Sequence, residues 1–338
     1  MSKHLSEWES IVARRTWTWI AVAGASALVL AACGGSSDSG DSSASGSPGG
    51  SAITDDLRLD GISVSVGSKD FDEQLILGQM MVQAFGAVGA SVDDKVNLGG
   101  TSVARSALES GEIDVYMEYN GTGWTVHLGQ EDPSFDSVEL TNGVAELDLE
   151  RNNIVWIGRS PFNNTYGFAS SPEVTEANGG PFTLQTMMEY VRDNPDAVVC
   201  MESEFPERPD GLILTEEATG ITLPSGQAQI LDTGVIYTET ANNNCTFGEV
   251  FTTDGRIPAL GLALVEDPGV NIVYNVSATF RKEKFDEAPE SFQGIIDAIL
   301  APLSNERMAQ LNAEVSADGE EPSAVAKAFL VEQGIIGG

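Results

Sequence analysis

Basic residues are scarce in this chain. Its 338 residues include 17 Lys and Arg against 51 Asp and Glu, which gives a formal net charge of −34 at pH 7. Such a charge repels the phosphates of nucleic acid and disfavours electrostatic docking on anionic lipid. We therefore expect no nucleic-acid partner, and the acidic excess is typical of a highly soluble protein.

Histidine is rarer still. The chain has 2 histidines, and a Ser-His-Asp site would depend on His127, with no GxSxG elbow to present a serine. One histidine and two separated cysteines make a poor zinc set, and there is no GxxxxGK[ST] phosphate loop. These absences predict no enzymatic activity, no metal and no cofactor. An extracellular hydrolase that uses His127 stays open as an alternative.

Long apolar runs are also missing. The apolar run from Trp17 to Leu30 follows Arg14 and Arg15 and ends in Leu-Ala-Ala before Cys33. A basic start, a short apolar stretch and small residues before the cleavage site are typical of a secretory signal. The last residues resemble a bacterial lipobox, which implies a signal peptide at 1–32 and lipid attachment at Cys33. The alternative to a signal peptide is a single transmembrane anchor, but the apolar run is short for crossing a bilayer. We expect an extracytoplasmic protein anchored by lipid to the cell membrane.

Residues 33–60 are mostly Gly, Ser, Asp and Ala. This composition has little to bury and predicts a flexible tether, whose average reach is roughly 30 Å.

Two further cysteines, Cys200 and Cys245, complete the total of 3. In an oxidising compartment they make a plausible disulfide. Two separate buried thiols are the alternative.

From residue 61 onward, short apolar strands alternate with helical stretches, which predicts an α/β protein with parallel strands. The length suggests two domains. We place the chain crossings near residues 159–163 and 273–275. The predicted lobes are therefore 61–160 with 274–338, and 161–273.

The segment LGGTSVARSALESGEIDVYMEYNGT, residues 98–122, combines two element ends. A helix from Thr101, with Val103, Ala107 and Leu108 on one side, offers free N–H groups at its start. A strand then carries Tyr119 toward Thr122 at its carboxyl end, where α/β sheets place ligands. We interpret this edge as half of a cleft for a small zwitterion with a quaternary ammonium group.

Several blocks occur together in one order: GSKDFDEQLILGQM, the segment above, FNNTYGFA, EFPERPDGL and GEVFTTDGRI. Over nearly all of residues 61–335, the chain resembles the glycine betaine/choline/carnitine substrate-binding proteins of osmoprotectant ABC importers. The resemblance implies a two-lobed periplasmic-binding-protein fold (type II, Venus-flytrap) with two crossover strands. It also implies a monomer whose partners are an ABC permease and its ATPase.

A trimethylammonium group has no N–H to donate, so aromatic faces recognise it, each for roughly 0.5–2 kcal/mol. A ligand carboxylate needs donors and positive charge. By resemblance, the cage comprises Tyr119, Tyr166 and Tyr274, with Phe251 where the family usually has another tyrosine. The resemblance also implies that Lys69, Thr122 and Arg208 bind the ligand's carboxylate. Gln74, Gly100 and Thr101 are secondary candidates for ligand binding.

Choline-preferring relatives tend to carry an acidic residue at the position of Thr122, so threonine here favours a ligand with a carboxylate, such as glycine betaine. Asp70 and Asp72 replace the family's usual Asn and Thr, and these acids beside Lys69 are expected to weaken the anion site. Choline, carnitine or an amino acid remain alternative ligands. A purely structural surface lipoprotein is a further alternative.

Overall fold

The computed structural model describes residues 57–337. The predicted signal peptide, Cys33 and the tether up to residue 56 lie outside the described residues. Leu59 is fully buried, and its N–H donates to the carbonyl of Val88 at 3.0 Å. The packed part of the chain therefore begins before residue 61.

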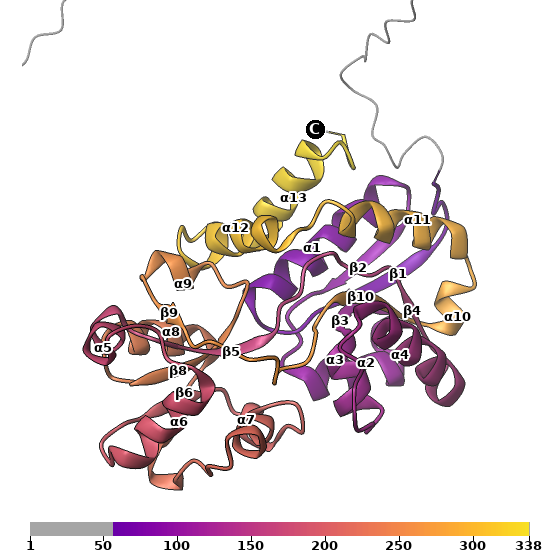
Figure 1. Ribbon diagram of the computed structural model, residues 1–338. Helices are drawn as coiled ribbons and strands as arrows, with labels where there is room; N and C mark the ends of the chain where they lie inside the picture. Colours follow the sequence, from indigo (N-terminus) through magenta and orange to yellow (C-terminus); the bar gives the residue numbers. More distant parts are fainter. Residues whose placement is uncertain (1–56, 338) are drawn as a thin grey trace, which may run out of the picture. The chain divides into compact units, whose positions relative to one another are not determined.

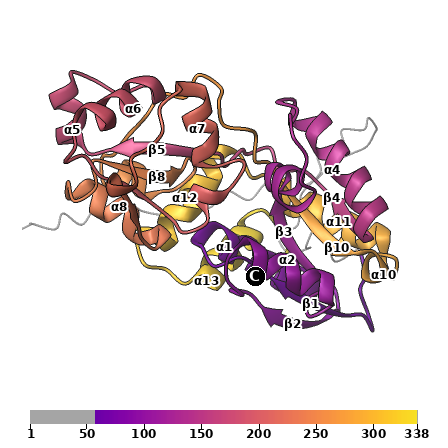
Figure 2. The same cartoon turned by 90° about the horizontal axis from the view of Figure 1, so that it is seen from below.

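Two five-stranded sheets organise the described residues (Figure 1). Sheet A has the order β2 (Ser91–Lys95), β1 (Ser63–Gly67), β3 (Val115–Tyr119), β10 (Val276–Arg281) and β4 (Ile154–Ile157). Sheet B has the order β7 (Ala228–Ile230), β6 (Val199–Met201), β8 (Phe247–Phe251), β5 (Tyr166–Ser170) and β9 (Ala263–Leu264). We call the elements around sheet A lobe I and those around sheet B lobe II. Figure 2 shows the two groups from below.

Each sheet contains one strand that runs against its neighbours. β10 is antiparallel to β3 and β4, and β5 is antiparallel to β8 and β9. The chain passes from sheet A to sheet B between β4 and β5, and returns between β9 and β10. The strands locate each crossing only to the interval between two strands, so the exact lobe boundaries at residues 160 and 274 stay predictions.

The two crossing segments hydrogen-bond to each other. The N–H of Asn164 donates to the carbonyl of Tyr274 at 3.2 Å, and the N–H of Tyr274 donates to Oδ1 of Asn163 at 2.6 Å. Nδ2 of Asn275 donates to the carbonyls of Ser160 and Phe162. Because polar backbone groups here find partners in the opposite crossing, the two passages form one connection between the lobes.

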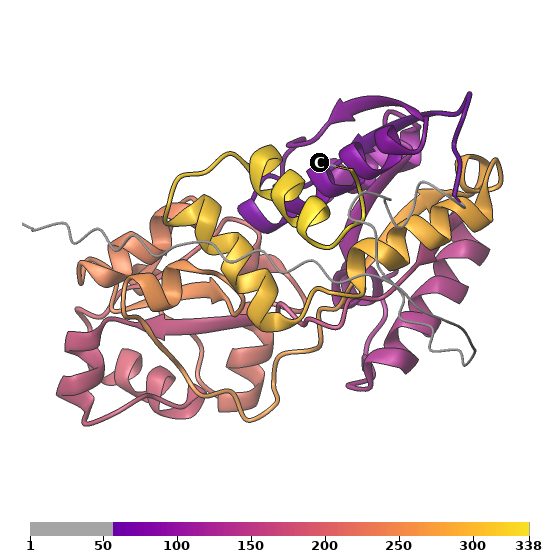
Figure 3. The same ribbon diagram turned by 90° about the horizontal axis from the view of Figure 1, so that it is seen from above.

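Helices cover both faces of sheet A. The helices of lobe I are α1 (Asp72–Ala87), α2 (Thr101–Ser110), α3 (Asn120–Thr122), α4 (Ser137–Asn152), α10 (Lys282–Phe285), α11 (Pro289–Leu300), α12 (Asn305–Ser316) and α13 (Pro322–Glu332). α1 buries Ile76, Leu77, Met80 and Phe85 in a core shared with α11, α12 and α13. α12 also packs on α9 (Arg256–Ala259) of lobe II. Figure 3 shows the yellow C-terminal helices beside the indigo helix α1.

The helices of lobe II are α5 (Pro172–Asn178), α6 (Leu184–Asp193), α7 (Leu212–Thr219), α8 (Thr233–Ala241) and α9 (Arg256–Ala259). α6 begins with a capping box at Thr183 and Thr186 and buries an apolar stripe in a separate core with Phe168 and Phe247. A disulfide joins Cys200 in β6 to Cys245, just before β8.

Some local predictions were wrong. The expectation that strands run parallel fails for β5 and β10, as described above. Val103 was predicted on the same side of α2 as Ala107 and Leu108, but it is 49% exposed, whereas Ala107 and Leu108 are buried.

Candidate functional site

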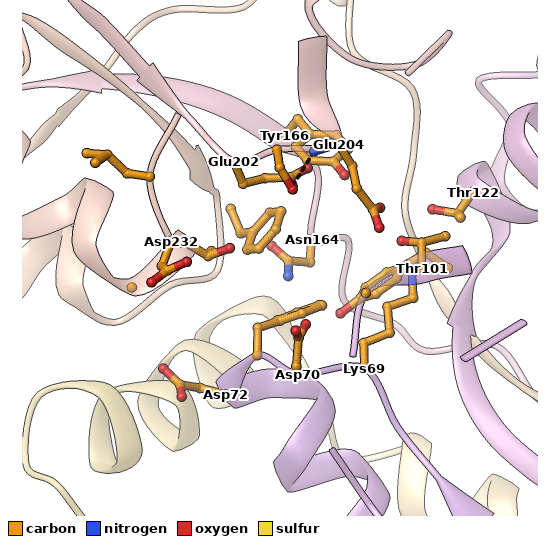
Figure 4. A pocket seen from close by; sticks show the side chains of 18 of the residues that line it. Lys69, Asp70, Asp72, Thr101, Thr122, Asn164, Tyr166, Glu202, Glu204 and Asp232 are labelled. Carbon is orange, nitrogen blue, oxygen red and sulfur yellow. Dashed lines mark hydrogen bonds between the residues drawn. The ribbon is translucent and has the colours of Figure 1, made fainter. Parts of the chain in front are cut away.

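A cavity of about 760 Å³ lies between the lobes. Its walls include residues from lobe I, from lobe II and from the returning crossing segment. Of the ten sequence-predicted ligand-binding residues, eight line it: Lys69, Gly100, Thr101, Tyr119, Thr122, Tyr166, Phe251 and Tyr274. Figure 4 shows Lys69, Thr101 and Thr122 on one side and Tyr166 on the other.

The aromatic rings reach the cavity because their strands end there. Tyr119 is the last residue of β3, and Tyr166, the first residue of β5, pairs in register with Phe251 at the end of β8. The ring centroids of Tyr166 and Phe251 are 5.4 Å apart, as are those of Tyr166 and Tyr274. Tyr119 and Tyr274 lie 6.4 Å apart. These four rings form one cluster across both lobes.

A fifth ring was not predicted. Phe71, just before α1, lines the same cavity, with its ring 5.0 Å from that of Phe251 and 6.2 Å from that of Tyr119. It follows the Lys69-Asp70 turn in the GSKDFDEQ block, so its position beside Lys69 was the available signal. We call Phe71, Tyr119, Tyr166, Phe251 and Tyr274 the ring cluster.

Two tyrosine hydroxyls of the ring cluster point to protein carboxylates. Tyr119 donates to Oε1 of Glu73 at 2.7 Å, and Tyr274 donates to Oδ2 of Asp210 at 2.9 Å. Burial and these neighbouring carboxylates raise the pKa of both hydroxyls well above the ordinary value. Both tyrosines are therefore neutral, and their hydroxyls are already occupied within the protein.

Glu73 connects the ring cluster to the rest of the molecule. Besides Tyr119, its carboxylate accepts hydrogen bonds from Asn164 in the first crossing segment, from Thr253 after β8, and from Asn312 in α12. Burial raises the pKa of this carboxyl, and the four hydrogen bonds act in the opposite direction. One side chain thus ties together both lobes and a crossing segment.

Lys69 carries its own counterion. Its Nζ lies 2.7 Å from Oε1 of Glu118 and 5.2 Å from the centroid of the Tyr119 ring. Glu118 also accepts from Tyr116 at 2.8 Å and lies 2.8 Å from Nε2 of His127. Burial raises the pKa of Glu118, but the charge of Lys69 and the hydrogen bond with His127 outweigh it and hold that pKa far below the ordinary value. His127 therefore belongs to a buried hydrogen-bonded cluster behind Lys69.

Arg208 lies behind the cavity wall and reaches from lobe II to lobe I. Its guanidinium donates to both carboxylate oxygens of Asp210 at 2.8 Å, to Thr101 Oγ1 at 3.3 Å and to Thr122 Oγ1 at 3.2 Å. The paired contact with Asp210 is a strong, directional interaction. Arg208 is only 5% exposed and is absent from the cavity lining.

Gln74 is the second predicted residue outside the lining. It is fully buried, and its Oε1 accepts from the N–H of Lys69 at 3.5 Å. Its Nε2 has no hydrogen-bond partner among the described residues. Gln74 therefore stabilises the turn at Lys69 through this hydrogen bond, from a buried position outside the cavity.

Five acidic side chains also belong to the lining. Asp70, Asp72, Glu202, Glu204 and Asp232 were not predicted as site residues, and all line the cavity (Figure 4). Asp72 lies 3.3 Å from Arg256 of lobe II, whose guanidinium is also paired with Asp254. Such a wall attracts a cationic group and repels a free anion.

Within residues 57–337, no group of three or more His, Cys, Asp and Glu side chains is arranged to hold a metal ion. In the same range, no helix combines the length and apolar character needed to cross a bilayer.

The comparisons with known proteins agree with the fold. Residues 62–332 match the family described as the substrate binding domain of ABC-type glycine betaine transport systems. The glycine betaine-binding protein YehZ of Escherichia coli is 32% identical over 80% of this chain and 90% of its own length. A glycine-betaine-binding protein of Pseudomonas aeruginosa is 31% identical over 81% of this chain and 89% of its own.

Solved structures give the same result. The structure of apo YehZ from Escherichia coli has a TM-score of 0.60 and 31% identity, and covers 81% of this chain and 99% of that protein's chain. A glycine betaine/carnitine/choline ABC transporter structure has a TM-score of 0.63 at 23% identity. The fold is that of type II periplasmic binding proteins, and the chain belongs to the substrate-binding family of ABC-type glycine betaine transport systems.

Proposed function

We propose that this chain captures a quaternary ammonium osmoprotectant, glycine betaine being the first choice, and delivers it to an ABC permease. The observation that carries the proposal is the ring cluster: five aromatic side chains from both lobes line one cavity. Aromatic rings attract a trimethylammonium group through the negative charge of their faces, and most strongly where water is excluded.

The lobe I part of the cavity beside the ring cluster offers partners for the ligand's carboxylate. The start of α2, the hydroxyls of Thr101 and Thr122, and the ammonium group of Lys69 lie there. A helix start and hydroxyl donors are suitable partners for a carboxylate. We assign Lys69, Thr101 and Thr122 to this end of the ligand and the ring cluster to the other, with Arg208 holding the two threonines from behind.

Substrate-binding proteins of ABC importers work outside the cytoplasm. We propose that Cys33 carries the lipid that keeps this one at the membrane, and that it acts as a monomer. Ligand contacts from both lobes would favour a closed state, which is the form offered to the permease.

Calorimetric titration with glycine betaine, choline, carnitine and proline tests the ligand assignment. We expect glycine betaine to bind, and proline, which has no trimethylammonium group, to bind far more weakly. Absence of binding by all quaternary amines would refute the proposed function. The alternative of a hydrolase finds no support in the position of His127, which is enclosed with Glu118 behind Lys69.

A further inference from the structure

One carboxylate of lobe II lies opposite the start of α2. Glu204 precedes the short helix Phe205–Glu207, and its N–H donates to Oε2 of Glu202 at 2.6 Å, which fixes the turn. Figure 4 shows its carboxylate directed toward Thr101 and Thr122. Its side chain is 33% exposed and forms part of the cavity wall.

Gly100 makes room for this carboxylate. A Cβ atom at position 100 would clash with Oε1 of Glu204. The backbone of Gly100 has a φ of −68°, which any residue can adopt, so conformation does not require glycine here. A side chain at this position would instead displace the flexible end of Glu204. Gly100 is the N-cap of α2 and supplies no side-chain cap. Glu204 therefore approaches an uncapped helix start, which attracts anions.

The two cations near Glu204 already have ion-pair partners. Lys69 is paired with Glu118, and Arg208 is paired with Asp210. Glu204 is a third carboxylate in this group, with its Oε2 at 3.6 Å from Arg208 Nη1. Two cations and three carboxylates leave the end of the cavity assigned to the ligand's acid group with a negative sum.

We propose that Glu204 is a specificity-determining residue, whose carboxylate competes with a ligand carboxylate for the start of α2. It lowers the affinity for a betaine, while a quaternary ammonium alcohol such as choline has no charge to clash with it. This proposal deepens the proposed function and rests on it. A betaine binds by displacing Glu204 toward the solvent.

A purely structural role of Glu204 predicts the opposite change in betaine affinity when its charge is removed. If Glu204 mainly held Arg208 in place, its removal would loosen Arg208 and weaken betaine binding. In the competing role, its removal strengthens betaine binding.

The test is the Glu204→Gln variant of the full chain, titrated calorimetrically with glycine betaine and with choline. The neutral amide keeps the size of the side chain and removes its charge. We expect the ratio of the choline Kd to the betaine Kd to rise by about tenfold or more, because a unit charge a few ångströms away is removed in a partly buried site. An unchanged ratio, or a weaker betaine complex, overturns the proposal.

Glu207→Gln is the matched control. Glu207 belongs to the same loop and undergoes the same charge change, but it is exposed and absent from the cavity lining. It should leave the ratio within about twofold of the wild type, because exposed charges farther from the ligand are screened by salt. A shift equal to that of Glu204→Gln would show a general charge effect and overturn the proposal.

Gly100→Ala gives a second route to the same end. Its methyl group would push the Glu204 carboxylate away without removing it, so we expect the ratio to move in the same direction in this variant. An opposite movement contradicts the proposal. Wild-type protein that binds neither ligand would refute the proposed function itself, whereas wild-type binding with no effect of Glu204→Gln refutes this inference alone.

Discussion

At the residue scale, the two cations predicted to hold a ligand's acid group each have an internal partner. Lys69 pairs with Glu118 and Arg208 with Asp210, and all four side chains are buried. Leaving either cation unpaired in such a place would cost several kcal/mol. Lys69, Arg208 and the tyrosines could be found from sequence blocks. The counterions of Lys69 and Arg208 could not be found in this way, because acidic residues are abundant along the whole chain.

Tyr119 allows the ring and the hydroxyl to be tested separately. Tyr119→Ala removes a ring from the cavity wall, and we expect it to weaken glycine betaine binding by about 1–2 kcal/mol or more. Tyr119→Phe keeps the ring and removes only the hydroxyl that donates to Glu73. We expect it to change affinity far less and to lower the free energy of unfolding instead, by about 1 kcal/mol.

Calorimetric titration and urea unfolding of both variants provide the two readouts. Equal losses of affinity in Tyr119→Phe and Tyr119→Ala would mean that the hydroxyl, rather than the ring, serves the ligand.

Glu249 predicts a pH dependence of stability. Burial and the charge of Glu202 raise the pKa of Glu249 to about 8 from an ordinary value of 4.5. The folded protein therefore retains a proton that the unfolded chain releases. The resulting stabilisation is complete below pH 4.5 and is lost as the pH rises toward 8.

Glu249→Gln mimics the protonated form and should lack this dependence. Urea unfolding at pH 5 and pH 8 should show the variant gaining stability relative to the wild type by a few kcal/mol at the higher pH. A difference between the two proteins that is the same at both pH values would contradict the assignment.

At the element scale, the disulfide links two strands that are already neighbours. Cys200 lies in β6, and Cys245 lies just before β8, its parallel neighbour. The bridge closes a segment with a sequence separation of 45. Restricting the unfolded chain in this way is worth about 4 kcal/mol.

Replacing both cysteines by serine should therefore lower the free energy of unfolding by about that amount. Neither cysteine lines the cavity, so betaine affinity should stay near the wild-type value. Equal urea midpoints for the wild type and the double variant would show that the bridge contributes nothing. Loss of affinity in a folded variant would contradict the separation of bridge and site.

Elements with their own apolar signal were predictable, and those that depend on distant partners were not. β1, α1 and β3 follow from runs or stripes of apolar residues. α5 buries no residue, so it leaves no stripe to recognise. β10 acquires its role by inserting between β3 and β4, which come more than a hundred residues earlier. No local pattern specifies that insertion.

At the scale of the whole molecule, the site exists only where the lobes face each other. Glu73 of lobe I accepts a hydrogen bond from Thr253 of lobe II, and Arg208 of lobe II donates to Thr101 and Thr122 of lobe I. These links bring the ring cluster and the start of α2 to one cavity. The sequence indicated the cleft through its family resemblance, but Glu204 became recognisable only once the lobes were in place.

We expect the rings to bind a positive charge and not merely a bulky apolar group. Calorimetric titration with glycine betaine and with 3,3-dimethylbutanoate tests it, because the second compound replaces the quaternary nitrogen by carbon and keeps the shape and the carboxylate. We expect the carbon analogue to bind about tenfold more weakly or worse. Equal affinity for the two compounds would contradict the account.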